Sequence, residues 1–413
     1  MPPPFDFNCS FSAPNAATLP AKLTPLAERR LAKSAHPWIY SKSIQKIKAD
    51  GKPGDVVILF RQRDNQVFGV GLYDPDTPIP IKMLHYHGRQ TIDPAFFLAK
   101  IKAAWALRRP LRDANRTNAY RLVYGENDGL PGLIADLYDR VLVVKLYSLI
   151  WLPHLEAILQ SLAETSGCSV VVLRLSRQLH KSDNFGFHDG QVLLGQLAHE
   201  DVEFEEYGVR FKANVIKGHK TGFFLDHREN RHKVGLLAAG KTLLDVFSYA
   251  GGFAVHALAQ GATEATCLDI SRQALELAQQ NAALNPHTGH LTTIAGDAFV
   301  VFDDLVAHGK QYDIVVIDPP SFAKSNDEVR RALKKYAQLA ETGRALTRSG
   351  GVLVLASCSS RVTADDFFGT VEPALGIPEG RFTVIEKTYH AVDHPVGFAE
   401  GAYLKCGYYR KVR

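Results

Sequence analysis

Three aspartates end strand-like runs in the C-terminal half of the chain. Asp269 closes the run 265–268, Asp297 follows the next segment of the same kind, and Asp318 ends the run 312–317. The carboxyl ends of parallel strands share one edge of an open α/β sheet, where such folds bind ligands. There Asp269 can accept hydrogen bonds from two ribose hydroxyls, and Asp297 can bind an adenine amino group. Each acid alone could be a helix cap, but three in succession favour a nucleoside site.

Asp318 and Cys358 are the candidate catalytic residues. Asp318 begins Asp-Pro-Pro-Ser-Phe, and its prolines stop the strand so that the carboxylate can meet the polar edge of a flipped-out base. Cys358 follows the strand-like run 351–356 within Ser-Cys-Ser-Ser. A thiolate that adds to carbon 6 of a pyrimidine makes carbon 5 nucleophilic, and Asp318 would stabilise the adduct. The alternative is a small buried cysteine, which we predict for Cys267 and Cys406.

A glycine-containing turn precedes these residues. The strand-like run 242–247 leads into Ser-Tyr-Ala-Gly-Gly-Phe and then a helix over 254–260. Glycines allow backbone N–H groups to approach a ligand closely. The pattern is neither G-x-G-x-x-G nor G-x-x-x-x-G-K, which disfavours a nicotinamide dinucleotide or ATP. A second helix is predicted over 271–284, with Ser271 as its N-cap.

The elements around these residues predict an α/β fold. From about residue 203, a hairpin-like stretch leads into alternating strands and helices, which indicates a parallel sheet covered on both faces. Short strand-like runs before residue 90 predict a small barrel-like β domain. A helix near 93–112 would bury Phe96, Phe97, Ile101, Ala104 and Leu107. The expected domains are 1–20 as a disordered tail, 21–90 as the β domain, 91–202 as a central α/β domain and 203–413 as the catalytic domain.

The charge pattern favours a nucleic-acid partner. The chain has 413 residues and a formal net charge of +5, and it is too long for one ordinary core. Eight basic residues, including Lys48, and two acids lie from Lys22 to Lys52. A second basic cluster, which contains Trp105, spans Lys100 to Arg121. Such blocks could follow phosphates or could be ordinary solvated faces.

Several protein classes are disfavoured by the sequence. No apolar run approaches the ~18 residues of a membrane span. The first twenty residues have no Lys or Arg, which is atypical of a secretory or transit signal. The five cysteines are scattered without a C-x-x-C pair, which argues against a disulfide framework or a zinc site. We therefore expect a cytoplasmic protein with no metal and no membrane partner.

Six motifs give the chain a family resemblance. They are His-Pro-Trp-Ile-Tyr-Ser at 36–41, Gly-Glu-Asn-Asp-Gly-Leu-Pro-Gly-Leu at 125–133, Lys-Thr-Gly-Phe-Phe-Leu-Asp-His-Arg at 220–228, Asp-Val-Phe-Ser-Tyr-Ala-Gly-Gly-Phe at 245–253, 318–322 and 357–359. Because of these motifs, the chain resembles the bacterial 23S rRNA cytosine-5 methyltransferases that carry an N-terminal PUA domain. The resemblance begins at about residue 21 and runs to the end of the chain.

The resemblance implies a class I, Rossmann-like fold with a seven-stranded, mainly parallel sheet, preceded by a PUA domain and a central α/β domain. It implies S-adenosylmethionine as cofactor, large-subunit ribosomal RNA as partner, and Cys358 and Asp318 as catalytic residues, and it leaves a homodimer open. The implied cofactor-binding residues are Phe247, Ser248, Tyr249, Ala250, Gly251, Gly252, Asp269, Ile270, Asp297, Ala298, Asp318, Pro319, Thr221 and Arg228.

Two other functions remain open from the sequence. Relatives that share the cofactor turn and Asp-Pro-Pro but lack the cysteine methylate a guanine nitrogen, and an aromatic such as Phe322 could help to grip an amino group. A non-catalytic RNA-binding factor for ribosome assembly could also keep the fold. The sequence does not identify the modified nucleotide, and it does not say whether naked RNA or a ribosomal particle is the substrate.

Overall fold

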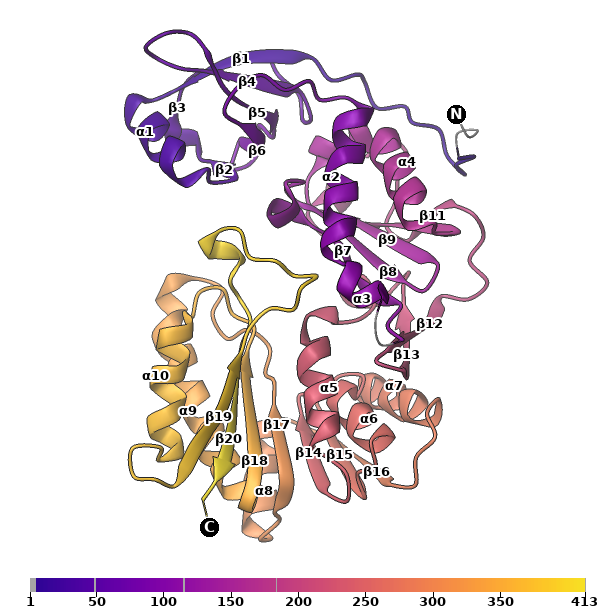
Figure 1. Cartoon of the computed structure of the whole chain (residues 1–413), viewed down its shortest axis with the longest axis vertical. Helices are drawn as coiled ribbons and strands as arrows, with labels where there is room; N and C mark the ends of the chain where they lie inside the picture. The colour runs from indigo at the N-terminus through magenta and orange to yellow at the C-terminus, as the bar shows by residue number, and fades with distance from the viewer. Residues whose placement is uncertain (1–4, 48–49, 114–115, 183, 413) are drawn as a thin grey trace. The chain divides into compact units, whose positions relative to one another are not determined.

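The computed structural model describes residues 5–47, 50–113, 116–182 and 184–412 (Figure 1). Two compact units divide the chain. The first unit runs to Phe204 and also includes Ala213–Leu225 and Val392–Phe398; the second comprises Glu205–Lys212, Asp226–Ala391 and the chain from Ala399. The predictions for residues 1–4 and for Lys48 lie outside the described residues.

The first unit opens with a six-stranded sheet of order β2-β6-β5-β4-β1-β3. Thr24 caps α1 by accepting a hydrogen bond from the Ala27 N–H, and Pro25 occupies the first turn, as helix N-termini favour. Leu19, Val57 and Met83 contribute to the small core. The elements are β1 (Thr18–Leu23), α1 (Pro25–Ser34), β2 (Trp38–Ile39), η1 (Ser41–Ser43), β3 (Ile44–Ile47), β4 (Val56–Phe60), β5 (Val67–Tyr73) and β6 (Ile81–Tyr86).

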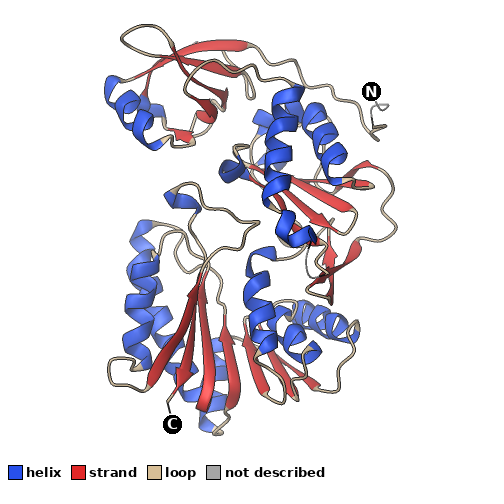
Figure 2. Ribbon diagram, viewed as in Figure 1, coloured by secondary structure: helices blue, strands red, loops and turns tan. Residues whose placement is uncertain are grey.

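A five-stranded sheet of order β11-β10-β9-β8-β7 follows, and α2 and α4 pack against each other beside it (Figure 2). Four of the five residues predicted for the buried face of α2 are buried, but Leu107 is 43% exposed. Leu107 is the last residue of α2, and Leu111 of α3 completes the buried face instead. The elements are α2 (Pro94–Leu107), α3 (Arg109–Asp113), β7 (Ala119–Tyr124), η2 (Gly125–Asp128), β8 (Leu133–Tyr138), β9 (Val141–Leu146), η3 (Leu149–His154), α4 (Leu155–Ser166), β10 (Val170–Leu175), η4 (Leu179–Lys181) and β11 (Gln191–Leu194).

The described part of the N-terminal segment differs from the disordered tail that the sequence predicted. The Asn8 N–H donates to the Leu193 carbonyl at 2.8 Å, and Phe7 forms a β-bridge with Leu194. The rings of Phe7 and Phe11 meet edge to face at 5.5 Å, and both residues pack against the core of the central sheet. Aromatic burial and pairing at the edge strand β11 therefore order this segment.

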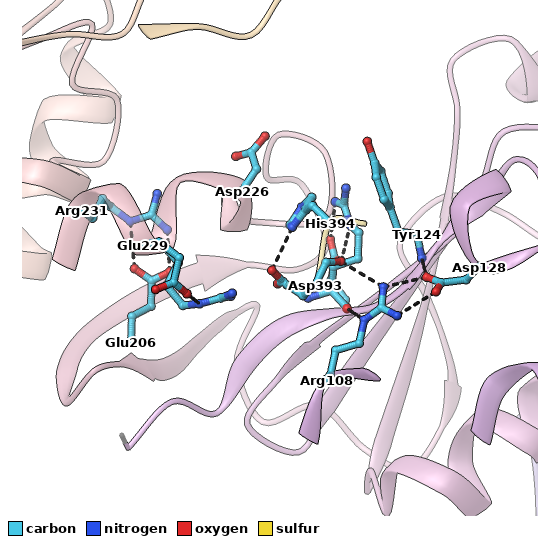
Figure 3. A network of polar contacts seen from close by, with 12 residues as sticks. Arg108, Tyr124, Asp128, Glu206, Asp226, Glu229, Arg231, Asp393 and His394 are labelled. Atoms are coloured by element: carbon cyan, nitrogen blue, oxygen red, sulfur yellow. Dashed lines mark hydrogen bonds and ion pairs between the residues drawn. The ribbon is translucent and has the colours of Figure 1, made fainter. Parts of the chain in front are cut away.

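Val392–Phe398 is held in the first unit by buried polar contacts (Figure 3). The Asp393 carboxylate accepts a hydrogen bond from the Arg121 N–H at 3.0 Å, and the Asp393 carbonyl accepts one from Arg108 Nη2 at 3.0 Å. Arg108 also forms a bidentate pair with Asp128. Both arginines belong to the second basic cluster, for which the sequence left a phosphate-binding surface and ordinary solvated faces open. Neither applies to these two arginines, because both are buried and ion-paired.

The predicted hairpin is confirmed as β12 (Asp201–Glu206) and β13 (Val209–Asn214). Tyr207 and Gly208 at its tip have φ of 50° and 79°. Positive φ at both central residues is what a type I′ turn requires. The division between the two units falls within these strands.

The second unit contains a seven-stranded sheet of order β16-β15-β14-β17-β18-β20-β19, in which β20 is antiparallel to both neighbours. The predicted seven-stranded, mainly parallel sheet is confirmed. Helices α5–α7 lie on one face and α8–α10 on the other (Figure 1). The elements are η5 (Leu225–His227), α5 (Arg228–Leu236), β14 (Thr242–Val246), α6 (Gly252–Ala259), β15 (Glu264–Asp269), α7 (Arg272–Ala283), β16 (His290–Ala295), α8 (Ala298–Ala307), β17 (Tyr312–Ile317), η6 (Asn326–Glu328), α9 (Val329–Leu346), β18 (Thr347–Ser357), α10 (Ala364–Leu375), β19 (Phe382–Thr388), η7 (Ala399–Gly401) and β20 (Lys405–Lys411).

Candidate active site

The turn between β14 and α6 has an unusual backbone. Phe247, Tyr249 and Gly251 have φ of 61°, 47° and 73°. Left-handed conformations cost a non-glycine residue roughly 1–2 kcal/mol and tend to occur at functional sites. Hydrogen bonds hold the turn: the Tyr249 N–H donates to Asp269 Oδ2 at 2.9 Å, and the Ser248 N–H donates to the Leu268 carbonyl at 3.1 Å. The end of β15 thus fixes the turn that follows β14.

Gly251 is required by packing as well as by conformation, and Gly252 by packing. A Cβ on Gly251 would lie 2.7 Å from the Cβ of Ala278 in α7, and one on Gly252 would lie 2.7 Å from Arg231 Cδ. Arg231 is itself fixed by a buried ion pair with Glu206 (Figure 3). The glycine pair therefore lets α6 begin close against α7 and α5.

Asp245 presents a buried carboxyl group beneath this turn. Its Oδ2 accepts a hydrogen bond from the Ala254 N–H at 3.1 Å, whereas its Oδ1 has no partner among the described residues. Burial raises the pKa of Asp245 to about 8, with smaller contributions from Asp318 and Asp269, and the Ala254 N–H opposes this shift. The sequence analysis did not select Asp245, although it lies in the quoted 245–253 motif.

Asp269 and Asp297 stand at the ends of β15 and β16, as predicted. Asp269 is half-buried, and its two oxygens accept hydrogen bonds from the N–H groups of Tyr249 and Ser271, at 2.9 and 2.8 Å. Carboxylate oxygens accept more than one bond, which leaves capacity for ribose hydroxyls. Asp297 is exposed and caps α8 by accepting from the Phe299 N–H. Of their neighbours, Ile270 is 75% exposed and Ala298 is buried.

Cys358 and Asp318 lie at the same edge of the sheet. They directly follow the neighbouring parallel strands β18 and β17, in which Ile317 pairs with Leu355. The Cys358 Sγ is 3.7 Å from the carbonyl oxygen of Pro319. Cys358 is partly exposed, whereas Cys267 and Cys406 are fully buried, as predicted for them.

His227 contacts Asp318 and was missed by the sequence analysis. Its Nε2 is 3.4 Å from Asp318 Oδ1. Burial alone would lower the pKa of His227, but the carboxylates of Asp318 and, to a smaller extent, Asp226 raise it above its ordinary value. Asn230 Nδ2 lies 3.1 Å from His227 Nδ1 on the other side of the ring. The only signal in the sequence was the position of His227 within the 220–228 motif.

Tyr336 and Lys405 are further ionisable neighbours of Cys358. Ser357 donates a hydrogen bond to the Tyr336 hydroxyl at 2.9 Å, and the rings of Tyr336 and Phe322 pack 5.2 Å apart. Lys405, the first residue of β20, is buried and pairs with Ser357 across the strands. Nothing in the spacing of the sequence marks Lys405, because its place depends on the antiparallel pairing of β18 with β20.

Thr221 and Arg228, the two predicted cofactor residues of the 220–228 motif, are both buried. Thr221 belongs to the first unit and is buried, and its hydroxyl donates to Asp136 Oδ2 at 2.5 Å. Arg228 begins α5 of the second unit and is fully buried, with its Nε 3.2 Å from Glu229 Oε1. Within the described residues, no cluster of three or more His, Cys, Asp or Glu is arranged to hold a metal ion. Each helix that the structure describes is too short or too polar to cross a membrane.

Comparison with known families assigns the chain to a family, through a match that covers parts of both units. The family described as S-adenosylmethionine-dependent methyltransferase matches residues 121–388. The chain belongs to this family. A second match, to a PUA-like domain, covers residues 21–86. The methyltransferase class, its cofactor and the N-terminal PUA-like domain are therefore as the sequence predicted.

This methyltransferase has full-length relatives. It is 41% identical over 399 residues to the "Ribosomal RNA large subunit methyltransferase" of Deinococcus radiodurans, covering 94% of this chain and 98% of the relative. It is 34% identical to the "Ribosomal RNA large subunit methyltransferase I" of Alteromonas mediterranea, covering 93% and 96%. A solved SAM-dependent methyltransferase structure from Streptococcus mutans superposes with a TM-score of 0.78 at 22% identity, covering 95% of this chain and 99% of that one, which shows the shared fold.

The turn after β14 fits the cofactor of this methyltransferase chemically. S-adenosylmethionine carries an ammonium group and two ribose hydroxyls, which need buried acceptors. Asp245 Oδ1 is a buried acceptor without a partner among the described side and main chains. Asp269 is a half-buried carboxylate on the neighbouring strand. The close approach at Gly251 and Gly252 keeps side-chain bulk away from the start of α6.

Proposed function

We propose that this methyltransferase modifies carbon 5 of a cytosine in large-subunit ribosomal RNA, with Cys358 as the nucleophile. The observation that carries the proposal is a partly exposed thiol next to Asp318 and Pro319, at the sheet edge where this fold binds its ligands. The names of the relatives support ribosomal RNA as the substrate.

In this proposal, the cofactor lies over the turn after β14. S-adenosylmethionine supplies an electrophilic methyl group when bound. Asp269 would hold the ribose hydroxyls, Asp297 the adenine amino group, and Asp245 the ammonium group. The remaining residues proposed to line the cofactor are Phe247, Ser248, Tyr249, Ala250, Gly251, Gly252, Ile270, Ala298, Asp318, Pro319 and Arg228. We do not propose a direct contact from Thr221, because its hydroxyl donates to Asp136.

Cys358 would make carbon 5 reactive by covalent addition. The thiolate forms a bond to carbon 6, and the electron pair of the 5,6 double bond moves to carbon 5. Asp318 would hydrogen-bond ring nitrogen 3 or the exocyclic amine and so stabilise the charge that spreads into the ring. After carbon 5 has gained the methyl group, a base removes its proton. The electron pair of that C–H bond then restores the double bond and expels the thiolate.

His227 would act on this step through Asp318. The raised pKa of His227 favours its protonated form, which forms an ion pair with the Asp318 carboxylate. Because His227 is also in contact with Asn230, its ring is held from both sides. We therefore assign His227 as a positioning residue for Asp318 rather than as a group that meets the base.

The N-terminal PUA-like domain would grip the RNA backbone. Its exposed basic side chains form what we call the basic face: Arg29, Arg30, Lys33, Lys42, Lys46 and Lys52. Phosphate contacts of this kind supply affinity without sequence information. We propose the cytoplasm as the compartment, because ribosomal RNA of the relatives' bacterial hosts is made there.

The test of the covalent mechanism is Cys358→Ala. We expect it to bind S-adenosylmethionine like the wild type in calorimetry, to lose methylation of ribosomal RNA, and to form no adduct with RNA that carries 5-fluorocytidine. Cys9→Ala is the matched control, since Cys9 is a partly exposed thiol of the first unit and should leave all three measurements unchanged. Mass-spectrometric mapping of ribosomal RNA from cells with and without the protein would identify the nucleotide.

Other outcomes would select the alternatives. Full methylation by Cys358→Ala would indicate direct transfer to a base nitrogen, for which Asp318 and Phe322 would suffice. Absence of cofactor binding by the wild type would favour an assembly factor that does not catalyse. Transfer to a nitrogen would use an aromatic ring such as that of Phe322 to grip the amino group. Among the described residues, the Phe322 ring packs on Tyr336, and no contact favours nitrogen transfer specifically.

A further inference from the structure

Lys405 holds the loop that follows Cys358. Its Nζ donates hydrogen bonds to the carbonyl oxygens of Ser359, at 2.5 Å, and of Val362, both of which lie just beyond Cys358 in the chain. A third bond goes to the Tyr403 carbonyl at 3.1 Å. The side chain is almost fully buried, with 2% of the residue exposed. Main-chain carbonyls accept the hydrogen bonds of this buried lysine but carry no net charge. A protonated Lys405 therefore places a positive charge inside the protein that these partners do not neutralise.

Lys405 contacts the main chain on both sides of Cys358, because it pairs with Ser357 across the strands and bonds the carbonyl of Ser359. Within the described residues, the bonds of Lys405 Nζ all go to main-chain carbonyls, and no carboxylate lies within ion-pair distance of it. Burial lowers the pKa of Lys405 to about 8. Two neighbours oppose that shift by favouring the charged ammonium, first Cys358 and then Asp366.

The other ionisable groups around Cys358 disfavour a thiolate or are already paired. Asp318, at the end of β17, and Asp366, in α10, are acids. Tyr336 of α9 has its pKa raised by burial and, to a smaller extent, by Cys358 and Asp318. His227 is engaged with Asp318. Lys405 of β20 is thus a cation placed to balance a negative sulfur.

We propose that Lys405 is a positioning residue that stabilises the thiolate of Cys358 and fixes the loop behind it. Only the thiolate adds to carbon 6, and a free cysteine is mostly protonated near neutral pH, since its usual pKa is about 8.5. A cation held nearby increases the thiolate fraction. The inference deepens the proposed function of Cys358, but it can be tested without RNA or cofactor.

The experiment measures alkylation of Cys358 by iodoacetamide as a function of pH, with the labelled peptide quantified by mass spectrometry. Lys405→Met keeps the aliphatic stem and removes the charge. We expect the pH midpoint of alkylation to rise by about one unit, which is about a tenfold slower reaction near pH 7.

Lys411→Met is the matched control, because Lys411 lies on the same strand and also donates to two main-chain carbonyls, those of Arg344 and Thr347. Calorimetry with S-adenosylmethionine checks that each variant is folded. A Lys405→Met curve that superimposes on the wild-type curve, or an equal shift in Lys411→Met, would overturn the proposal.

A second pair of variants separates charge from hydrogen bonding. Lys405→Gln can still donate to two carbonyls but carries no charge, so we expect it to shift the midpoint as Lys405→Met does. Lys405→Arg retains the charge and should restore the midpoint toward the wild-type value. If Lys405→Met does not fold, an unshifted Lys405→Gln refutes the role of the charge. If the alkylation midpoint shifts as expected but the wild-type protein does not methylate RNA, the proposed function is refuted and the role of Lys405 is not.

Discussion

At the level of single residues, Asp245 shows how a ligand site can lower the stability of the free protein. Its carboxyl group is buried with one oxygen unpaired among the described residues, and its pKa is raised to about 8. The folded protein therefore retains a proton that the unfolded chain releases above about pH 4. The stability contributed by this group is fully present below about pH 4, falls as the pH rises, and changes no further above about pH 8.

We expect Asp245→Asn to raise the melting temperature of the cofactor-free protein by several degrees at pH 8. The amide still accepts the Ala254 N–H bond and carries no charge to bury, so the difference from the wild type should shrink toward pH 4. Differential scanning fluorimetry between pH 4 and 9 measures the effect. Affinity for S-adenosylmethionine should fall by roughly tenfold, since a charged hydrogen bond contributes about 1.5–3 kcal/mol.

Asp304→Asn is the control, because Asp304 is an exposed acid of α8 and should follow the wild-type curve. A melting-temperature difference that does not change with pH would contradict the assignment of Asp245 as the group that is protonated in the folded state.

At the level of elements, the contact between α6 and α7 depends on the absence of a side chain at Gly251. Gly251→Ala would combine a left-handed φ of 73° with a Cβ only 2.7 Å from that of Ala278. We expect a clearly lower melting temperature and loss of cofactor binding, because α6 must shift and the turn with it.

Gly309→Ala isolates the conformational part of that effect. Gly309 has a φ of 64°, but a Cβ there would meet nothing within 4 Å. Only the conformational strain of roughly 1–2 kcal/mol therefore remains at this position. Both variants can be compared by fluorimetry and calorimetry. Equal losses in the two would show that packing against α7 is unimportant.

The elements also show what the sequence could and could not predict. Parallel strands buried on both faces appear as continuous apolar runs, so the alternation from β14 to β18 and the acids at the strand ends were predictable. Lys405 and His227 were not, because their places depend on pairing and packing between segments distant in sequence. The ordered segment at Phe7 and Phe11 was missed because its burial is against a core formed by later residues.

At the level of the whole molecule, the basic residues of the first unit have two different roles that the sequence cannot separate. A run of basic residues does not reveal which members meet acids in the fold. Arg108 has no exposed side-chain surface and is paired with Asp128, whereas the Arg109 side chain beside it is 75% exposed. Burial, which only the structure shows, decides between an ion pair of the core and a surface for nucleic acid.

We therefore expect Arg108→Met to lower the free energy of unfolding of the first unit by about 3–5 kcal/mol, because the buried Asp128 carboxylate loses its cation. Arg109→Met should be indistinguishable from the wild type. Urea denaturation followed by tryptophan fluorescence reports on this unit through Trp38, Trp105 and Trp151, which all belong to it. A small effect of Arg108→Met would mean that the pair contributes little.

The segment Val392–Phe398 has a consequence for how this protein can be dissected. A fragment that stops at residue 204 would lack the Asp393 groups that receive hydrogen bonds from Arg108 and Arg121, as well as the Gly397 N–H that binds Asn127. A fragment that starts at residue 205 would carry this segment without those partners. We therefore expect neither half to fold on its own, and we expect gene fusions or domain swaps that cut the chain once to yield insoluble products.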